Sequence, residues 1–279
     1  MEVFSKSASP LTEEEWKDLE EAIYETGRQV LVCRRFLRLI GPIGPGHQVV
    51  SFDVLSNFEI GACELTPNKQ ESEPIKSVKK KHVPLPTIHK SFAINWRDLE
   101  YVRQFSLPID TSVARACAVA TALAEDSLII HGNKELGIEG FLNVEGHQTM
   151  SMSDWEVVGN AFSDIANGIS RLVERGFYGP YYLILNPKEY VKLNRVYHNT
   201  GILEIEQVRK LVKEVYQTPI MPEKKAILIN ATPADVDLVV GIDMSLLYIE
   251  STNMNHHFRV LEMVLPRIKR PASILVIGK

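Results

Sequence analysis

The histidine pair and the carboxylate pairs are the first residues of this chain to consider as a source of chemistry. His256 and His257 are adjacent in a segment with strand character. Adjacent strand residues point to opposite faces of a sheet, so these two imidazoles are poorly placed to bind one metal ion. Glu125 and Asp126 are adjacent in a predicted helix, where neighbouring side chains do not face each other. The sequence therefore predicts no metal site and no catalytic carboxylate dyad.

The motifs of common enzyme classes are absent from the sequence. It contains no P-loop, no HExxH zinc pair and no GxSxG nucleophile turn. The nearest approach to a dinucleotide motif is Gly41, Gly44 and Gly46, where the spacing differs and Pro42 and Pro45 intervene. No Ser–His–Asp or Cys–His arrangement indicates a peptidase. These absences favour a protein that is not an enzyme and that uses no cofactor.

Charge and cysteine content narrow the class further. The chain has 31 Lys and Arg against 35 Asp and Glu, a net charge of -4, whereas nucleic-acid binding favours a strongly basic surface. Two short basic runs, 79–81 and 267–270, are expected to be solvated strand edges or salt-bridge partners. Cys33, Cys63 and Cys117 are widely spaced without a CxxC pair, so we expect reduced thiols.

The sequence predicts a cytoplasmic location. No stretch approaches the roughly 18–20 apolar residues of a membrane helix. The N-terminal residues lack the apolar core of a secretory signal. We therefore expect neither a membrane partner nor a nucleic-acid partner.

The elements that position these residues begin with a clearly marked helix. Thr12 and Glu15 have the spacing of a capping box, and Leu11 and Trp16 that of a hydrophobic staple. A second helix is predicted over 109–131, capped by Asp110, rich in alanine and ended by Gly132.

Between these helices, two extended arms are predicted at 49–60 and 83–94, joined by the charged segment 66–81. An isolated hairpin is marginally stable, so we expect the pair to lie across another subunit. After the second helix, the pattern predicts helices at 155–175, after Asn186 and at 204–216. It also predicts strands at 181–185, 226–230, 238–242, 246–250, 258–265 and 273–277. The fold class is α+β.

The sequence resembles the encapsulin shell proteins, which share the tailed-phage major capsid fold of the Hong Kong phage type. The resemblance is carried by Ser9-Pro10-Leu11-Thr12 with Trp16, Arg34-Arg35-Phe36, Gly41-Pro42, Glu125-Asp126, His131-Gly132, the runs 137–142 and 267–272, and Gly179-Pro180-Tyr181. These pieces occur in family order over essentially the whole chain. The resemblance implies an icosahedral nanocompartment that encloses a cargo enzyme, with one chain contributing to several subunit contacts.

The resemblance also implies a domain plan. The plan has an N-terminal helix and start of the peripheral domain at 1–49, an extended loop at 50–92, a peripheral domain with the long helix at 93–154, an axial domain at 155–250, and a return to the peripheral domain at 251–279.

Two functional surfaces follow from the resemblance. A pore at the five-fold axis is expected from Tyr197, His198, Asn199, Thr200 and Gly201, for which a plain helix–helix connection is the alternative. A groove for a cargo targeting peptide is expected from Arg34, Phe36, Arg38, Met244, Leu246 and Tyr248, for which core packing is the alternative. Some family members carry an acidic residue at position 38. Flavin binding, known in some relatives near the Trp96 segment, is not expected because the aromatic register differs.

The implied cargo is a ferritin-like protein or a dye-decolorising peroxidase, which suggests iron storage or oxidative-stress defence. A phage capsid protein that packages DNA is the alternative, and a peptidase or bacteriocin is the least favoured reading.

Overall fold

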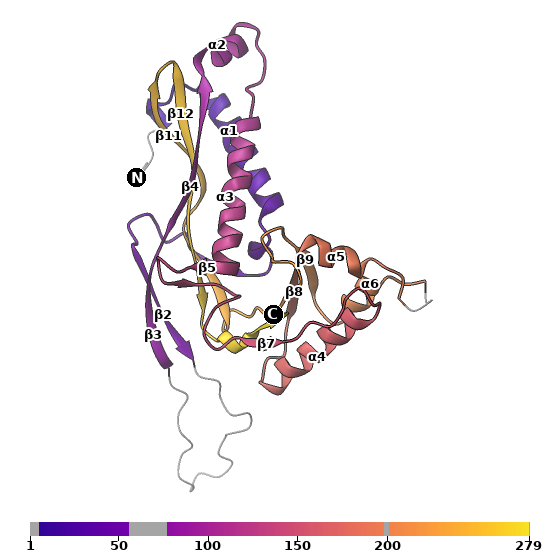
Figure 1. The fold of residues 1–279 in the computed structure, drawn as a ribbon. Coiled ribbons are helices and arrows are strands. Elements are labelled where there is room, and N and C mark those ends of the chain that lie inside the picture. Colours follow the sequence, from indigo (N-terminus) through magenta and orange to yellow (C-terminus); the bar gives the residue numbers. More distant parts are fainter. Residues whose placement is uncertain (1–5, 56–76, 198–200, 279) are drawn as a thin grey trace.

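The computed structural model describes residues 6–55, 77–197 and 201–278, which form two parts joined at an angle (Figure 1). One part is long and is built on a four-stranded sheet with two helices against it. The other is a lobe built on a five-stranded sheet. Helices and strands are mixed in both parts, so the predicted α+β class is confirmed.

The sheet of the long part has the order β1-β11-β12-β4. Its strands are β1 (Arg38–Ile40), β11 (Val236–Thr252), β12 (Asn255–Ile268) and β4 (Thr87–Asn95). The strands predicted at 238–242 and 246–250 are in fact one strand, β11, because its pairing with β12 continues past a register shift between Ile242 and Ser245. Two residues of β11 oppose one of β12 at this shift, which is the geometry of a β-bulge.

Two helices, α1 (Glu13–Val30) and α3 (Ser112–His131), run along the long sheet (Figure 1). The predicted capping box of α1 is confirmed, since Thr12 accepts from the Glu15 amide and Glu15 from the Thr12 amide. Helix α3 begins three residues later than predicted, because Asp110 accepts from the Ser112 amide ahead of the first turn. Ala114 and Ala118 of α3 pack in one core with α1 residues and Phe258.

The hairpin beside the long sheet consists of β2 (Val49–Leu55) and β3 (Ser77–Pro84). The prediction that 83–94 forms its second arm was wrong, because β3 pairs with β2 while β4 belongs to the long sheet. Leu85 and Pro86 lie between the two strands, and proline has no amide hydrogen to continue a ladder. Most of the segment predicted between the arms lies outside the described residues.

The lobe sheet has the order β7-β13-β10-β8-β9. Its elements are β7 (Gln148–Met150), α4 (Asn160–Glu174), β8 (Tyr181–Leu185), α5 (Pro187–Leu193), α6 (Glu204–Val208), β9 (Glu214–Gln217), β10 (Ala226–Asn230) and β13 (Ile274–Ile277). The helix predicted at 204–216 ends at Val208, because pairing with β8 overrides the helical periodicity of the following residues. Helix α4 begins at Asn160 and not at Trp155, whose indole donates to Asp164.

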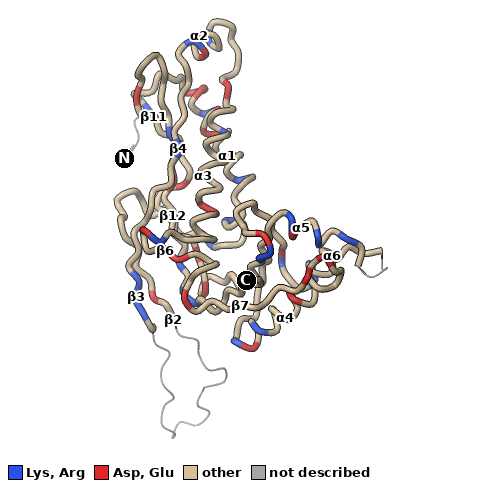
Figure 2. The backbone as a smooth tube through the Cα atoms, viewed as in Figure 1, with Lys and Arg blue, Asp and Glu red and all other residues tan. Residues whose placement is uncertain are grey.

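The remaining elements are short connections. They are the 3-10 turns η1 (Lys6–Ala8), η2 (Cys33–Arg35) and η3 (Pro271–Ser273), helix α2 (Trp96–Gln104) at the far end of the long part, and strands β5 (Gly132–Asn133) and β6 (Ile138–Glu139). Positively and negatively charged residues are interspersed along both parts, as Figure 2 shows. Three of the predicted ion-pairing cations, Arg267, Lys269 and Arg270, pair with Asp237 or Asp235.

Candidate functional site

A groove of about 510 Å³ lies where the end of α1 meets η2, β1 and β11. Its apolar lining comes from Tyr24, Leu31, Leu39 and Met244, together with Gly27. Its charged lining consists of Arg28, Arg34, Arg35 and Asp243. Tyr24 and Leu39 are 56% and 45% exposed, so the groove presents large apolar side chains to solvent. A hollow of this size with apolar walls and charged groups at its edge suits a short peptide segment.

The β-bulge of β11 shapes one wall of this groove. Asp243 and Met244 are the two residues that oppose Glu262 at the register shift. A bulge redirects side chains relative to a regular strand, and both of these residues line the groove. On the facing helix, a Cβ atom at Gly27 would lie 2.8 Å from the Met244 sulfur. Glycine at this position therefore allows α1 and β11 to approach closely.

Arg34 forms the floor of the groove and is held by three carboxyl groups. Its guanidinium donates to Glu125 at 2.6–2.9 Å, to Glu262 at 2.9 Å and to Asp243 at 2.5 Å. Burial by itself lowers the pKa of Arg34, but hydrogen bonds and charges from Glu125 and Glu262 outweigh it and raise that pKa. Arg34 is thus a fixed cation whose donors are already occupied by these acids.

The turn that carries Arg34 is held by the neighbouring carboxylate of α3. Asp126 accepts from the amides of Val32 and Cys33, both at 3.0 Å. Burial raises the pKa of Asp126 to about 6, although the two amide hydrogen bonds act in the opposite direction. Glu125 and Asp126 therefore serve different partners, as the helix geometry predicted for adjacent residues.

The residues predicted to bind a cargo peptide fall into two groups. Arg34 and Met244 line the groove. Phe36 is instead buried and stacked on Tyr182 and Tyr216, and Leu246 is 3% exposed in the core beneath α1.

The other two predicted residues lie near the groove without lining it. Tyr248 packs on that same core and its hydroxyl pairs with Ser251. Arg38 is exposed on β1, next to the groove residue Leu39. Of the six residues predicted for a cargo peptide, Arg34 and Met244 therefore line the groove, whereas Phe36, Arg38, Leu246 and Tyr248 do not.

Sequence reasoning missed the groove residues contributed by α1. Tyr24, Gly27, Arg28 and Leu31 recur at positions i, i+3, i+4 and i+7, which places them on one helix face. This face lies beside the buried stripe of Trp16, Leu19 and Ile23. This second stripe, which mixes apolar and basic residues at helical spacing, was the signal in the sequence that could have indicated these groove residues.

Of the residues predicted to line a pore, the structure describes Tyr197 and Gly201, whereas His198, Asn199 and Thr200 lie outside the described residues. The Tyr197 amide donates to the Ile202 carbonyl at 2.8 Å, and Val196 pairs with Leu203. The described residues on either side of positions 198–200 therefore pair with each other, between α5 and α6 in the chain.

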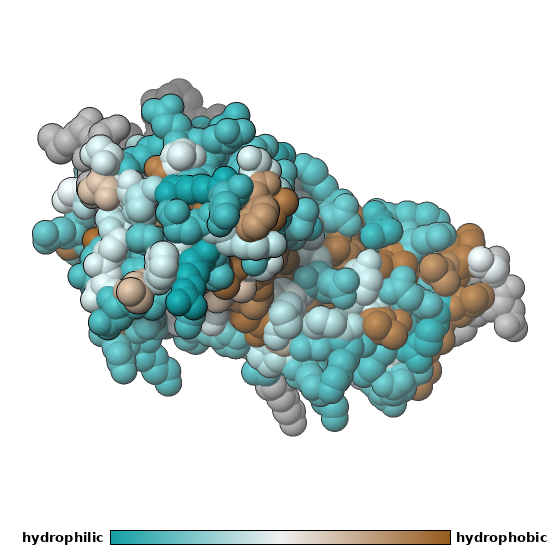
Figure 3. All heavy atoms as spheres, turned by 90° about the horizontal axis from the view of Figure 1, so that it is seen from above, coloured by the Kyte–Doolittle hydropathy of each residue, from teal (hydrophilic) through white to brown (hydrophobic). Residues whose placement is uncertain are grey.

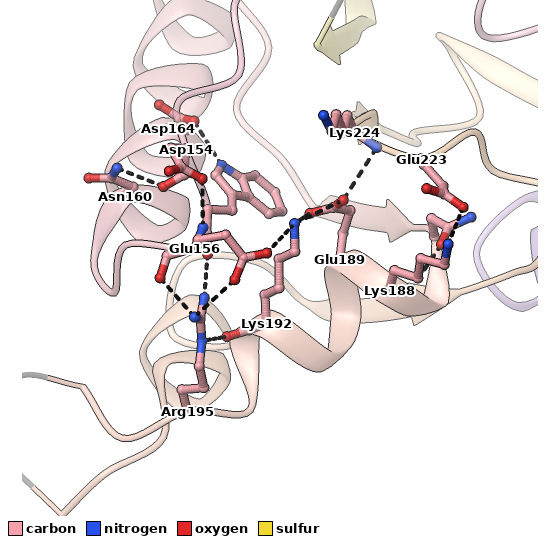
Figure 4. A network of polar contacts seen from close by, with 12 residues as sticks. Asp154, Glu156, Asn160, Asp164, Lys188, Glu189, Lys192, Arg195, Glu223 and Lys224 are labelled. Atoms are coloured by element: carbon pink, nitrogen blue, oxygen red, sulfur yellow. Dashed lines mark hydrogen bonds and ion pairs between the residues drawn. The ribbon is translucent and has the colours of Figure 1, made fainter.

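A polar network joins the start of the lobe to α5 (Figure 4). Lys192 bridges Glu156 and the buried Glu189, with both nitrogen–oxygen distances at 3.0 Å. Arg195 donates to the Glu156 carbonyl, and Asp164 accepts from the Trp155 indole at 2.8 Å. These contacts fasten the segment before α4 to α5.

Metal and membrane features were searched over the described ranges. Within residues 6–55, 77–197 and 201–278, no three His, Cys, Asp or Glu side chains gather as metal ligands. No described helix has the length and apolar character that crossing a membrane requires. His256 pairs with Ser251 at 2.6 Å through its Nδ1 atom.

Comparison with known proteins identifies the family of this chain. The family model described as "Encapsulating protein for peroxidase" matches residues 1–265. The chain belongs to the encapsulin shell-protein family. This encapsulin is 38% identical over 267 residues to the type 1 shell protein EncA of Myxococcus xanthus, covering 95% of this chain and 93% of that protein. It is 35% identical to a diheme-cytochrome-encapsulin shell fusion protein of Kuenenia stuttgartiensis, covering 97% and 75% of the two chains.

Solved structures agree with this assignment. The virus-like particle of Pyrococcus furiosus aligns with a TM-score of 0.78 and 26% identity over 95% of this encapsulin and 100% of that chain. The capsid of Myoviridae phage XM1 aligns with a TM-score of 0.62 and 11% identity over 92% and 91% of the two chains. The predicted tailed-phage capsid fold is confirmed, and the encapsulin is a structural shell subunit and not a catalyst.

The shell function gives a reason for the apolar side chains exposed on the isolated subunit. Figure 3 shows apolar residues scattered among hydrophilic ones on one face of the molecule. Tyr178, Val191 and Val196 are 71%, 67% and 52% exposed. Because this encapsulin assembles into a multi-subunit particle, exposed apolar side chains of this kind are available for contacts between subunits.

Proposed function

We propose that this encapsulin closes into an icosahedral, cytoplasmic nanocompartment and captures its cargo through a terminal targeting peptide bound in the α1–β11 groove. The groove is the observation that carries the proposal, since it combines exposed Tyr24 and Leu39 with a floor of paired charges. Apolar peptide side chains gain about 25 cal/mol for each Å² that they bury on such walls.

In this proposal, the residues predicted for the site have two different roles. Arg34 and Met244 contact the peptide directly, while Phe36, Leu246 and Tyr248 support the groove from the core behind it. Arg38 lies on exposed β1, where an extended peptide end passes. Arg28 adds a positive charge at the rim.

We propose a redox-active cargo, either ferritin-like or a dye-decolorising peroxidase. The family is described as encapsulating a peroxidase. A Pyrococcus furiosus relative, 29% identical over 73% of this chain, is a ferritin-like-encapsulin shell fusion protein. The compartment then serves iron storage or oxidative-stress defence.

We propose that the connection 197–201 lines a pore at the five-fold axis and admits small solutes to the cargo. The pairing of Val196 with Leu203 and of Tyr197 with Ile202, which brings the two ends of this connection together, supports this assignment. In the corresponding domain plan, residues 155–250 form the axial domain around that axis, and β11 at its end continues into the sheet of the long part. Residues 50–92 form the extended loop, and 1–49, 93–154 and 251–279 form the peripheral domain.

The groove is tested by loading a reporter into shells made in cells. A fluorescent protein is fused to the C-terminal segment of the cargo candidate encoded beside the shell gene, and fluorescence per purified particle is measured. Leu39→Asp places a charge on the apolar wall and is expected to lower loading on the order of tenfold, since a buried unpaired charge costs more than 1.4 kcal/mol. Electron microscopy of the same particles checks that hollow shells still form.

Leu136→Asp is the matched control. Leu136 is a leucine of similar exposure, 40% against 45%, in the turn between β5 and β6 outside the groove. Loading by this variant should equal that of the unmodified shell. Equal loading by intact Leu39→Asp particles would show that the groove does not hold the peptide.

A further inference from the structure

Arg34 is surrounded by more carboxyl groups than its single charge neutralises. Glu125 of α3, Asp243 of β11 and Glu262 of β12 all lie within hydrogen-bond distance of its guanidinium. The side chains of Glu125 and Glu262 are 0% exposed, whereas that of Asp243 is 56% exposed. Two of the three acids are therefore removed from water around one cation.

The hydrogen bonds distinguish the two buried acids. Both oxygens of Glu125 accept from Arg34, which is the arrangement of an ionised carboxylate. Glu262 offers only Oε2 to Arg34, and its Oε1 atom is buried without a hydrogen-bond partner in the part of the chain that the structure describes. A second buried carboxylate without its own counter-charge is costly, whereas a protonated carboxyl supplies an O–H donor.

The groups that face Glu262 come from every element packed around it. They are Arg34 from η2, Glu125 from α3 and Asp243 from β11, and the residue paired with it on β4 is the apolar Ile88. Burial raises the pKa of Glu262 well above its ordinary value, the charge of Glu125 raises it further, and Arg34 acts in the opposite direction. The surroundings of Glu262 thus favour its neutral form.

We propose that Glu262 carries a proton shared with Glu125, and that this neutral carboxyl positions Arg34 and the β11 bulge beneath the groove. Glu262 is the β12 residue opposite the bulge of Asp243 and Met244. Its O–H donates to the Glu125 carboxylate and its Oε2 accepts from Arg34, which joins α3, β12 and η2. Release of the proton to solvent places two carboxylates against each other and loosens the floor on which Met244 rests.

Infrared spectroscopy of the whole shell tests the proton directly. A protonated carboxyl group absorbs at higher frequency than a carboxylate. The band that a Glu→Gln variant loses therefore shows whether the replaced glutamate was protonated or ionised. In neutral buffer, Glu262→Gln is expected to lose a carboxylic-acid band, and Glu250→Gln, at an exposed residue of the same hairpin, a carboxylate band. Loss of a carboxylate band in both variants would overturn the proposal.

Reporter loading tests the positioning role, which is the one step that rests on the proposed cargo groove. Glu262→Gln keeps a donor and an acceptor, so its shells should load like the unmodified shell. Glu262→Ala leaves the pair incomplete and should lower loading on the order of tenfold in intact particles.

The outcomes of the loading test separate the two proposals. Normal loading by intact Glu262→Ala particles, together with reduced loading by Leu39→Asp, would reject the positioning role and keep the groove. Normal loading by both would reject the groove and the positioning role, while the infrared bands still decide whether Glu262 holds a proton. If Glu262→Ala forms no particles, loss of loading by Glu262→Gln shells would reject the positioning role.

Discussion

At the scale of single residues, the adjacent acids Glu125 and Asp126 of α3 bind different partners. Glu125 holds the guanidinium of Arg34, and Asp126 satisfies the amides of the preceding turn. Their adjacency in the sequence excluded a catalytic dyad but did not indicate these partners, because both lie more than 90 residues away. Buried acids of this kind stabilise a fold only while each keeps its donors.

Asp126→Ala should destabilise the subunit by about 1–3 kcal/mol, because the Val32 and Cys33 amides lose their acceptor. Denaturant unfolding of disassembled subunits, followed by tryptophan fluorescence, measures this loss. The matched change Asp154→Ala removes an exposed carboxylate that accepts from the Glu156 amide. An equal loss in both variants would contradict the assigned role of Asp126.

Asp126 also makes the free energy of unfolding of the subunit depend on pH. The pKa of Asp126 is raised from an ordinary value of 3.8 to about 6, so the folded state binds the proton more tightly than the unfolded state. Its contribution to the free energy of unfolding is therefore fully present below pH 3.8 and is lost as the pH rises through about 6. Between pH 3.8 and about 6, the free energy of unfolding should fall less steeply with pH in Asp126→Asn than in the unmodified subunit. Identical slopes in the two proteins would contradict the raised pKa of Asp126.

At the scale of elements, helix caps and prolines mark element boundaries that can be predicted from the sequence. The capping box of α1 and the terminal Gly132 of α3 were predicted correctly because they are local contacts. The strand partners were predicted less well, because β3 and β4 both carry apolar residues and only the tertiary ladder assigns one to β2 and the other to β12.

Thr12→Ala should lower stability by about 1 kcal/mol through loss of the capping box. The melting temperature of the subunit reports this loss as a decrease of a few degrees. Thr111→Ala is a close control, since Thr111 stands at the N-cap of α3 without a side-chain capping bond. Comparable decreases in the two variants would show that the cap of α1 is not the cause.

At the scale of the whole molecule, the long part and the lobe give the subunit a shape suited to a curved shell. Positively and negatively charged residues are interspersed along the backbone of both parts, as Figure 2 shows, and the net charge is -4. Fold likeness to phage capsids therefore does not extend to the basic surface that packaging of nucleic acid favours.

Shells purified from cells should hold no nuclease-protected nucleic acid, because a subunit with a net charge of -4 does not neutralise phosphates. Gel electrophoresis of nuclease-treated, then disrupted, particles provides the measurement. A discrete protected band that persists in shells washed at high salt would support the phage-capsid reading instead. Nucleic acid that the nuclease removes would not support that reading, because it lies outside the shell.

The sequence by itself determined the family, the α+β class, the helix caps and the segments that meet at the groove. These features depend on local spacing and on residues that occur in a fixed order along the chain. The tertiary structure alone decided which side chains face the groove, because a bulge in β11 and a second face of α1 bring Met244 and Leu31 together. It also placed Phe36 and Leu246 in the core, since burial depends on contacts between elements that no local pattern specifies.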